Sequence, residues 1–355
     1  LYLQDLTLQN ALEYYKSGSA GRAVCLQDRG TQTICKNVKM LSYQDTYYSN
    51  EPNGKGQFYF EDSEIHGTVD YVCGGGDVYF NRVLFVNESR KEGEKNGENV
   101  IAAPNSKSEW GYIFKDCTIE NKAKAFSLGR SWNNITRLTW LNTTVNQKDE
   151  ILNDDTKYAY FTINAMGDAI ADKFRLDVLK DAEGNVFSPA EKKVVFKNSG
   201  ATQQKAEENI ILTAEEAATY SLDAVFGDWK PEVKSAQAAA PAATLKDGTL
   251  SWTGEAKMYL VSKDGKFYAL TSENSLAVEG EGSFTVRAAN EMGGFDRADN
   301  STDTGIENIA TSADVLSTKI YSADGVQASK LQRGINIVVK TMADGSKKTS
   351  KVVLK

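Results

Sequence analysis

The segment Phe58-Tyr59-Phe60-Glu61-Asp62-Ser63-Glu64-Ile65 decides the predicted fold. It reads as a short strand with alternating inward-facing apolar positions, and Asp62 interrupts it in the middle. Similar segments, each with Asp or Asn in the middle, occur at 3–8, 34–40, 112–119 and 138–145. Three of the four intervals between successive interruptions fall roughly 20–35 residues apart, which is the range of solenoid repeats, and the interval from Asp62 to Asp116 is about twice as long.

A mid-strand Asp or Asn suits a bend, because its side chain can hydrogen-bond to nearby backbone. Long helical patterns are absent from this part of the chain. The sequence therefore predicts an all-β protein, a right-handed parallel β-helix followed by small β-sandwich modules. An antiparallel sandwich is the alternative, but the irregular spacing without Asn-Gly hairpin signals at each corner counts against it.

The chain divides into four predicted parts. Residues 1–233 carry the β-helix, and residues 234–243, which are rich in Ala, form a linker. Strand signals return at residues 244–300 and predict a sandwich of the immunoglobulin or fibronectin kind. Residues 301–355 form a C-terminal β-module with Asp-Gly turns.

A capping box at Thr213-Ala214-Glu215-Glu216 predicts a short helix through Tyr220. We expect this helix to cover a flank or an open end of the solenoid.

Composition excludes several classes of function. The net charge of −7 argues against a nucleic-acid partner, which would need a basic footprint. No apolar run approaches the ~20 residues that span a bilayer. The single histidine, His66, excludes a conventional His-based triad or a multi-His metal site within one chain. The four cysteines are scattered, so we expect buried free thiols, with one disulfide as the alternative in an exported protein.

Two acids are the leading candidates for chemistry. Asp45 lies in Tyr43-Gln44-Asp45-Thr46, and Asp70 lies 25 residues later in Gly67-Thr68-Val69-Asp70-Tyr71. Carboxylates one coil apart in sequence can become neighbours in space, where one attacks and the other moves protons. Taken singly, each would more often be a bend residue, since solenoid corners favour Asp.

Three ordered motifs resemble the central signatures of pectin methylesterases, the carbohydrate esterases of family eight. They are Gln44-Asp45-Thr46-x-Tyr48, Gly67-Thr68-Val69-Asp70 and Leu128-Gly129-Arg130-x-Trp132. The resemblance covers roughly residues 1–230. It implies a right-handed parallel β-helix that removes methyl esters from galacturonate units of pectin, without a metal or organic cofactor.

The resemblance also implies roles for individual residues. Asp70 would be the nucleophile that forms an acyl-enzyme intermediate, and Asp45 the general acid that then becomes the base. Arg130 would orient Asp70, and Gln44 would donate to the oxyanion. Trp132 and Tyr48 would form apolar platforms for the sugar rings.

Two positions depart from the family pattern. Arg22 stands where the family carries a second oxyanion Gln, so it could donate to an oxyanion, bind a neighbouring uronate carboxylate or mark weakened catalysis. Cys73 replaces an aromatic residue that normally contacts substrate. These changes predict a differently shaped substrate site, which would suit branched pectin.

Family members carry further coils and an early Gly-x-Tyr-x-Glu signature ahead of the point where this chain begins, so we expect opening coils to be missing here. The segment Phe284–Gly294 resembles a module appended to polysaccharide-degrading enzymes of Bacteroidetes-type bacteria, and the C-terminal end resembles sorting domains of that group. This resemblance implies export to the periplasm, the cell surface or the extracellular medium.

Two other functions remain open at this point. A non-catalytic pectin-binding protein is compatible with Arg22, Cys73 and the missing opening coils. A β-helix pectate or pectin lyase would need a calcium-binding carboxylate cluster and a basic proton abstractor, and no compact acidic cluster of that kind stands out in the sequence.

Overall fold

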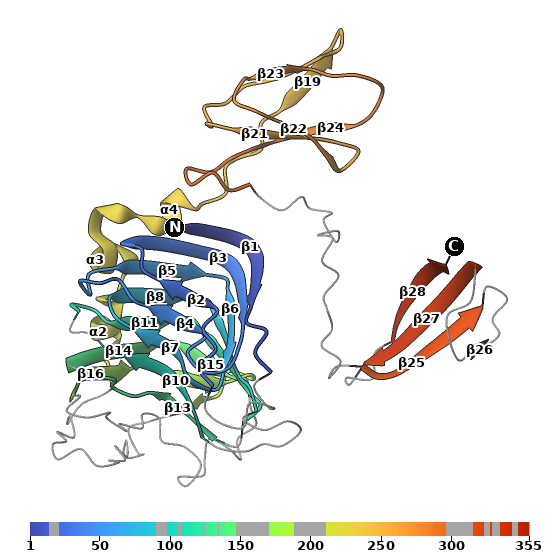
Figure 1. The fold of residues 1–355 in the computed structure, drawn as a ribbon. Helices are drawn as coiled ribbons and strands as arrows, with labels where there is room; N and C mark the ends of the chain where they lie inside the picture. The colour runs from blue at the N-terminus through green and yellow to red at the C-terminus, as the bar shows by residue number, and fades with distance from the viewer. Residues whose placement is uncertain are drawn as a thin grey trace. The chain divides into compact units, whose positions relative to one another are not determined.

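The computed structural model describes most of the chain, and its described part is almost entirely β-structure (Figure 1). The described residues are 1–13, 21–89, 98–105, 108–123, 125–133, 135–146, 170–187, 211–295, 315–322, 327–328, 334–342 and 347–354. They divide into two compact units, Leu1–Asp296 and Arg297–Lys355.

The first unit begins with three parallel ladders of strands. The first ladder contains the N-terminal half of β3 (Gln32–Leu41), β5 (Gln57–Glu61), β8 (Asp77–Asn81), β11 (Tyr112–Lys115), β14 (Ile135–Leu141) and β16 (Ile170–Leu176). The second contains the C-terminal half of β3, β6 (Glu64–Gly67), β9 (Leu84–Asn87), β12 (Thr118–Asn121), β15 (Thr143–Val145) and β17 (Leu179–Asp181). The third contains β2 (Leu26–Asp28), β4 (Tyr47–Ser49), β7 (Val69–Gly74), β10 (Glu98–Pro104) and β13 (Ala125–Gly129).

A complete coil contributes one strand to each ladder, and neighbouring coils pair in parallel. β1 (Tyr2–Gln9) pairs in parallel with the whole length of β3, and β18 (Val186–Phe187) turns back antiparallel on β17. Figure 1 shows the coils stacked on one another. The predicted parallel β-helix is therefore confirmed, and the alternative of an antiparallel sandwich is wrong for this part of the chain.

The bend between the first and second ladders has a left-handed backbone at each Asp or Asn that was predicted to interrupt a strand. The φ angles there lie between 48° and 54°, at Asp5, Asn37, Asp62, Asp116 and Asn142. Asp and Asn tolerate this conformation better than other non-glycine residues, because their short side chains bond locally. Arg82 adopts the same conformation, with φ 55°.

Aromatic residues in matching register fill the centre of the β-helix. Phe60, Phe80, Phe114 and Trp140 occupy paired positions on successive strands and are fully buried. Their neighbouring ring centroids are 4.9, 4.8 and 3.8 Å apart. Because a slip of one residue would turn each ring out of the core, this stack fixes the register of the coils.

Three short helices pack against a flank of the β-helix: α2 (Ala214–Ala218), α3 (Leu222–Phe226) and α4 (Pro231–Lys234). Phe226 of α3 packs against Tyr59 and Tyr79, which point outward from the first ladder. The predicted capping box is present, since Thr213 and Glu216 bond each other's backbone amides. The helix ends before the predicted Tyr220, because Ser221 caps the next helix.

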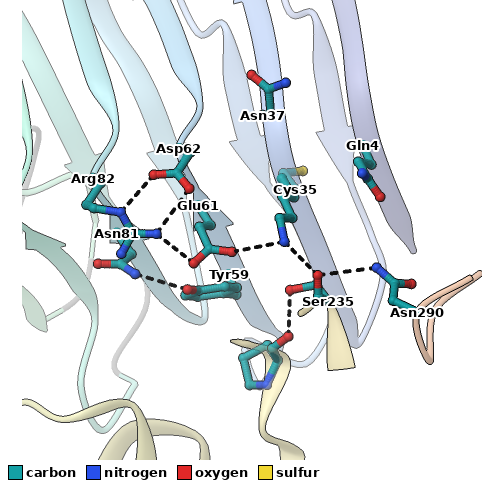
Figure 2. Close-up of polar contacts among 12 residues, drawn as sticks. Gln4, Cys35, Asn37, Tyr59, Glu61, Asp62, Asn81, Arg82, Ser235 and Asn290 are labelled. Atoms are coloured by element: carbon teal, nitrogen blue, oxygen red, sulfur yellow. Dashed lines mark hydrogen bonds and ion pairs between the residues drawn. The ribbon is translucent and has the colours of Figure 1, made fainter. Parts of the chain in front are cut away.

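Polar side chains connect neighbouring coils on the outer surface. Figure 2 shows Arg82 bonded to Asp62 and Glu61 of the preceding coil, and Asn81 bonded to Tyr59. Lys36 reaches from β3 to Glu61 and to the backbone carbonyl of Ser235.

The rest of the first unit is a small sandwich of two antiparallel sheets. One sheet contains β19 (Ala243–Lys246), β20 (Thr249–Trp252) and β23 (Ser275–Ala277). The other contains β22 (Lys266–Thr271), β21 (Tyr259–Lys263) and β24 (Phe284–Ala288). Both sheets bury side chains in one core that includes Trp252, Tyr259 and Val286.

The second unit contains one antiparallel sheet among its described residues. Its strands are β25 (Val315–Ser322), β26 (Gln327–Ala328), β27 (Gly334–Met342) and β28 (Lys347–Leu354), in the order β26-β25-β27-β28. The division into the four domains named above stays a prediction.

Candidate active site

Asp45 and Asp70 occupy equivalent turns on adjacent coils, where the chain enters the third ladder. Both have a left-handed backbone, with φ 58° and 50°. Two backbone hydrogen bonds link the turns, from Asp45 N to Val69 O at 3.3 Å and from Thr68 N to Tyr43 O at 2.8 Å. The stacking of coils therefore brings together two acids that are 25 residues apart in sequence.

Arg130 comes to the same place from a later coil. Its backbone amide donates to Ala102 O at 2.9 Å, directly after β13. Its guanidinium grips the Asp70 carboxylate at two points, with Nε 2.7 Å from Oδ1 and Nη2 bonded to Oδ2. The side chains are 15% and 8% exposed, so this is a largely buried, two-point ion pair of the strong kind.

Asp45 has a longer, single contact with an arginine, in contrast to Asp70. Arg22 lies on the preceding coil, paired with Gln44 through a parallel β-bridge, and its Nε is 3.5 Å from Asp45 Oδ2. The Gln44 side chain hydrogen-bonds to the Asp45 carboxyl group. An amide NH₂ has two donors, so this bond leaves Gln44 a second one for a substrate oxygen.

The two acids differ electrostatically. Burial and the nearby Asp70 charge raise the pKa of Asp45 to about 6, although Arg22, Gln44 and Arg130 oppose the rise. Burial also raises the pKa of Asp70, and the Arg130 guanidinium opposes this rise. Because Asp70 has the two-point contact with arginine and Asp45 only a long one, a shared proton favours Asp45.

Trp132 and Tyr48 form an aromatic pair near these acids. Trp132 follows Arg130 and is fixed by a bond from its amide to Pro104 O at 2.9 Å. Its ring centroid is 5.9 Å from that of Tyr48, at an interplanar angle of 47°. Both side chains are half-buried, so each keeps an exposed part.

Cys73 pairs with Tyr48 across adjacent strands, but only 2% of it is exposed. Burial, with the charges of Asp45 and Asp70, raises the pKa of its thiol well above the ordinary value. The thiol is therefore neutral and no nucleophile.

Sequence reasoning assigned no role to Thr46 and only a general one to His66. Buried Thr46 donates its hydroxyl to His66 O at 2.7 Å, so it ties the Asp45 turn to the next coil. The His66 ring lies between Glu64, 2.5 Å from Nε2, and Glu88, 2.7 Å from Nδ1. The spacing of 22 residues from His66 to Glu88, about one coil, is the sequence feature that could have predicted this contact.

The structure also describes the cysteines and the helices of the chain. All four cysteines are free, as expected; Cys25 is half-buried and the others are buried. Among the described residues, no helix is both long and apolar enough to cross a membrane.

Comparison with known proteins identifies a family that resembles the first part of the chain. Residues 1–153 match the model of the pectinesterase family. This part of the chain is therefore similar to pectinesterases. The resemblance found in the sequence motifs is thereby confirmed for the segment that contains Asp45, Asp70 and Arg130.

Curated proteins similar to this chain include two pectinesterases. Pectinesterase B of Pectobacterium parmentieri is 30% identical over 154 residues, which are 39% of this chain and 38% of that protein. Pectinesterase A of Dickeya chrysanthemi is 27% identical over 260 residues, which are 64% of this chain and 65% of that protein. The chain thus spans between about a third and two thirds of the length of these relatives.

Solved structures similar to the chain include pectin methylesterase PemA from Erwinia chrysanthemi. The two are 24% identical with a TM-score of 0.43, over 65% of this chain and 70% of that one. The pectin methylesterase from carrot is 15% identical with a TM-score of 0.43, over 64% of this chain and 66% of that one.

Proposed function

We propose that this chain hydrolyses methyl esters of galacturonate units in pectin through an aspartyl acyl-enzyme intermediate. The observation that carries the proposal is the meeting of Asp45 and Asp70 on adjacent coils, with Arg130 bound to Asp70 at two points. This arrangement provides one ionised acid for attack and one acid that holds a proton.

In the first half of the reaction, an Asp70 carboxylate oxygen attacks the ester carbonyl carbon. Arg130 orients that carboxylate, and the free N–H of Gln44 stabilises the oxyanion of the tetrahedral intermediate. When the intermediate collapses, the bond to the methoxy oxygen breaks, and Asp45 gives its proton to that oxygen. Methanol leaves, and the uronate acyl group remains joined to Asp70 as a mixed anhydride.

In the second half, Asp45 is ionised and acts as a base. It takes a proton from water, whose oxygen attacks the acyl carbon, and the bond to Asp70 breaks. Asp70 returns as a carboxylate beside Arg130, and the product is a uronic acid that ionises at neutral pH. The sum is ester plus water giving acid and methanol.

The aromatic pair and Cys73 are the basis for our proposals about how the substrate binds and which pectin is preferred. Trp132 and Tyr48 offer half-buried ring faces on which sugar rings can stack. Cys73 is buried on the strand next to Tyr48 and stands in place of a larger aromatic residue, so we propose that the substrate surface has a different shape that suits branched pectin. Faster release of methanol from branched than from smooth pectin would support this part of the proposal. Because a polymeric substrate cannot cross a membrane unaided, we also propose that the protein is exported to the periplasm, cell surface or medium.

The proposal is tested by methanol release from methylated pectin, in the wild type and in single variants. We expect Asp70→Asn to lower the rate at least about a thousandfold. We expect Asp45→Asn to lower it about 10²–10⁴-fold, because a proton-transfer group is lost. Asp62→Asn is the matched control, since Asp62 has the same left-handed backbone at a bend of another ladder. We expect this control to release methanol as the wild type does.

Three outcomes would contradict the proposal. Unchanged release by Asp70→Asn would remove the nucleophile. Binding of pectin without any methanol release by the wild type would select a non-catalytic binding protein. An unsaturated, ultraviolet-absorbing product in place of methanol would select a lyase.

A further inference from the structure

Two arginine–aspartate pairs lie side by side, and they differ in solvent exposure and in the number of contacts between the two side chains. Arg130 and Asp70 are 15% and 8% exposed and bond at two points. Arg22 is 79% exposed, and its Nε is 3.5 Å from an Asp45 oxygen, which is a single long contact. Arg130 is therefore fixed in place, whereas Arg22 can exchange its partner at low cost.

The backbone of Arg22 is held firmly although its side chain is open. Residue 22 forms a β-bridge with Gln44, and the amide of buried Ala23 donates to Gln44 O at 2.9 Å. The base of the arginine side chain therefore stays beside Asp45, and only the side chain can move. Its planar fork carries five donors and suits two-point binding of a carboxylate better than the single contact seen here.

Arg22 acts against the role proposed for Asp45. A general acid must hold a proton, and a neighbouring guanidinium favours the ionised form. The groups that act on the Asp45 carboxyl group are Asp70, Arg22, Gln44 and Arg130, and those that sense its charge include Tyr48 and Cys73. Of the two cations, Arg130 is engaged by Asp70, so Arg22 is the one that a ligand can remove.

We propose that Arg22 is a specificity-determining residue that transfers from Asp45 to a free uronate carboxylate beside the ester to be cleaved. Departure of the guanidinium leaves Asp45 protonated and ready to act as the acid. This inference rests on the proposed esterase function and narrows its substrate class to partly de-esterified polyuronates. A fully methylated chain has no such carboxylate and leaves Arg22 on Asp45.

The test compares two short oligouronates, one fully methylated and one with a free carboxylate next to a methyl ester. Methanol release gives kcat and kcat/KM across pH, which report the enzyme–substrate complex and the free enzyme respectively. With the partly free substrate, we expect the alkaline fall of kcat to lie about one pH unit above that of kcat/KM. With the fully methylated substrate, we expect the two falls to coincide.

Arg22→Gln supplies the second arm of the test. We expect its kcat/KM fall to move up by about one pH unit and its preference between the two substrates to shrink toward one. Arg29→Gln, a change of another exposed arginine seven residues away, should keep the wild-type profile and preference. Since Arg22 is mostly exposed, we expect its variant to fold, and a thermal transition like that of the wild type checks this.

Failure of the inference is distinct from failure of the proposed function. Methanol release with the same pH profile on both substrates would overturn the inference alone, as would a preference that Arg22→Gln retains. An absence of release from either substrate by the wild type would overturn the esterase function and the inference with it.

Discussion

Asp45 and Asp70 combine a left-handed backbone with burial and charge in one small region. Each non-glycine residue in such a conformation costs of order 1 kcal/mol, and the surrounding hydrogen bonds must hold it there. Burial beside a second acid adds a further cost, which appears as a raised pKa for both carboxyl groups. In the proposed mechanism, this costly environment would let Asp70 attack the ester while Asp45 transfers the proton.

The raised pKa of Asp45 predicts how activity depends on pH. The acid works only when protonated, so kcat/KM should fall as pH rises through about 6. Gln44→Met removes a hydrogen bond that lowers this pKa, so the fall should move to higher pH by up to about one unit. A pH series of methanol release measures both values, and an unchanged fall in Gln44→Met would contradict the assignment to Asp45.

The sequence motifs predicted which residues gather at this site, but not all of their contacts. The order of the motifs placed Asp45, Asp70 and Arg130 on different coils of one solenoid. The contact of Arg22 with Asp45 could not be predicted, because it depends on how the coil before Asp45 stacks and on which rotamer Arg22 adopts. The burial of Cys73 was expected, because scattered cysteines without a pairing pattern are typical of buried free thiols.

At the scale of elements, the bends between ladders decide the fold. Five of them were predictable, because Asp or Asn interrupts an apolar strand and tolerates the left-handed conformation. The bend at Arg82 was not, since arginine has no preference for that conformation. Its ion pairs with Asp62 and Glu61 on the preceding coil compensate, and they become visible only when the coils are stacked (Figure 2).

The second ladder carries a charge cluster that predicts pH-dependent stability. His66 is held by Glu64 and Glu88, which also contact Lys39 and Lys122. Hydrogen bonds to the two carboxylates raise the pKa of His66 against the effect of burial. The stabilisation is therefore fully present below the unfolded value of about 6.5 and is lost as pH rises through the higher folded value.

We expect His66→Leu to lower the free energy of unfolding by about 3 kcal/mol at pH 6, because two part-buried carboxylates lose their partner. The loss should be smaller at pH 9, where the wild-type imidazole is neutral. Lys122→Met, which removes an exposed cation from Glu88, should cost less than about 1 kcal/mol. Urea unfolding at the two pH values measures these differences, and an equal loss at both would contradict a charged His66.

At the scale of the molecule, the first strand of the β-helix is joined to a loop nearly 300 residues later. Asn290 donates to Tyr2 Oη at 3.0 Å and to Ser235 O at 3.2 Å, and its own oxygen accepts from the amides of Met292 and Gly294. Gln4 donates to Phe295 O at 2.8 Å. Through these buried and part-buried hydrogen bonds, we expect β1 and the loop of the sandwich to stabilise each other.

Asn290→Ala should therefore loosen β1 as well as its own loop. We expect a loss of about 2 kcal/mol, because several buried partners are left without a hydrogen bond. Hydrogen exchange should become faster at residues 2–9, which belong to a different module from the mutated residue. Asn274→Ala, which removes an exposed bond within the sandwich, is the control. Unchanged exchange at residues 2–9 in Asn290→Ala would contradict the coupling.

The spacing of the ion pair along the chain also matters during synthesis. The two acids leave the ribosome 25 residues apart, but the arginine that neutralises Asp70 follows it by 60 residues. A chain that adds coils one at a time would hold two adjacent negative charges without Arg130 for that whole interval. The ion pair that neutralises Asp70 can therefore form only after the later coil has been synthesised.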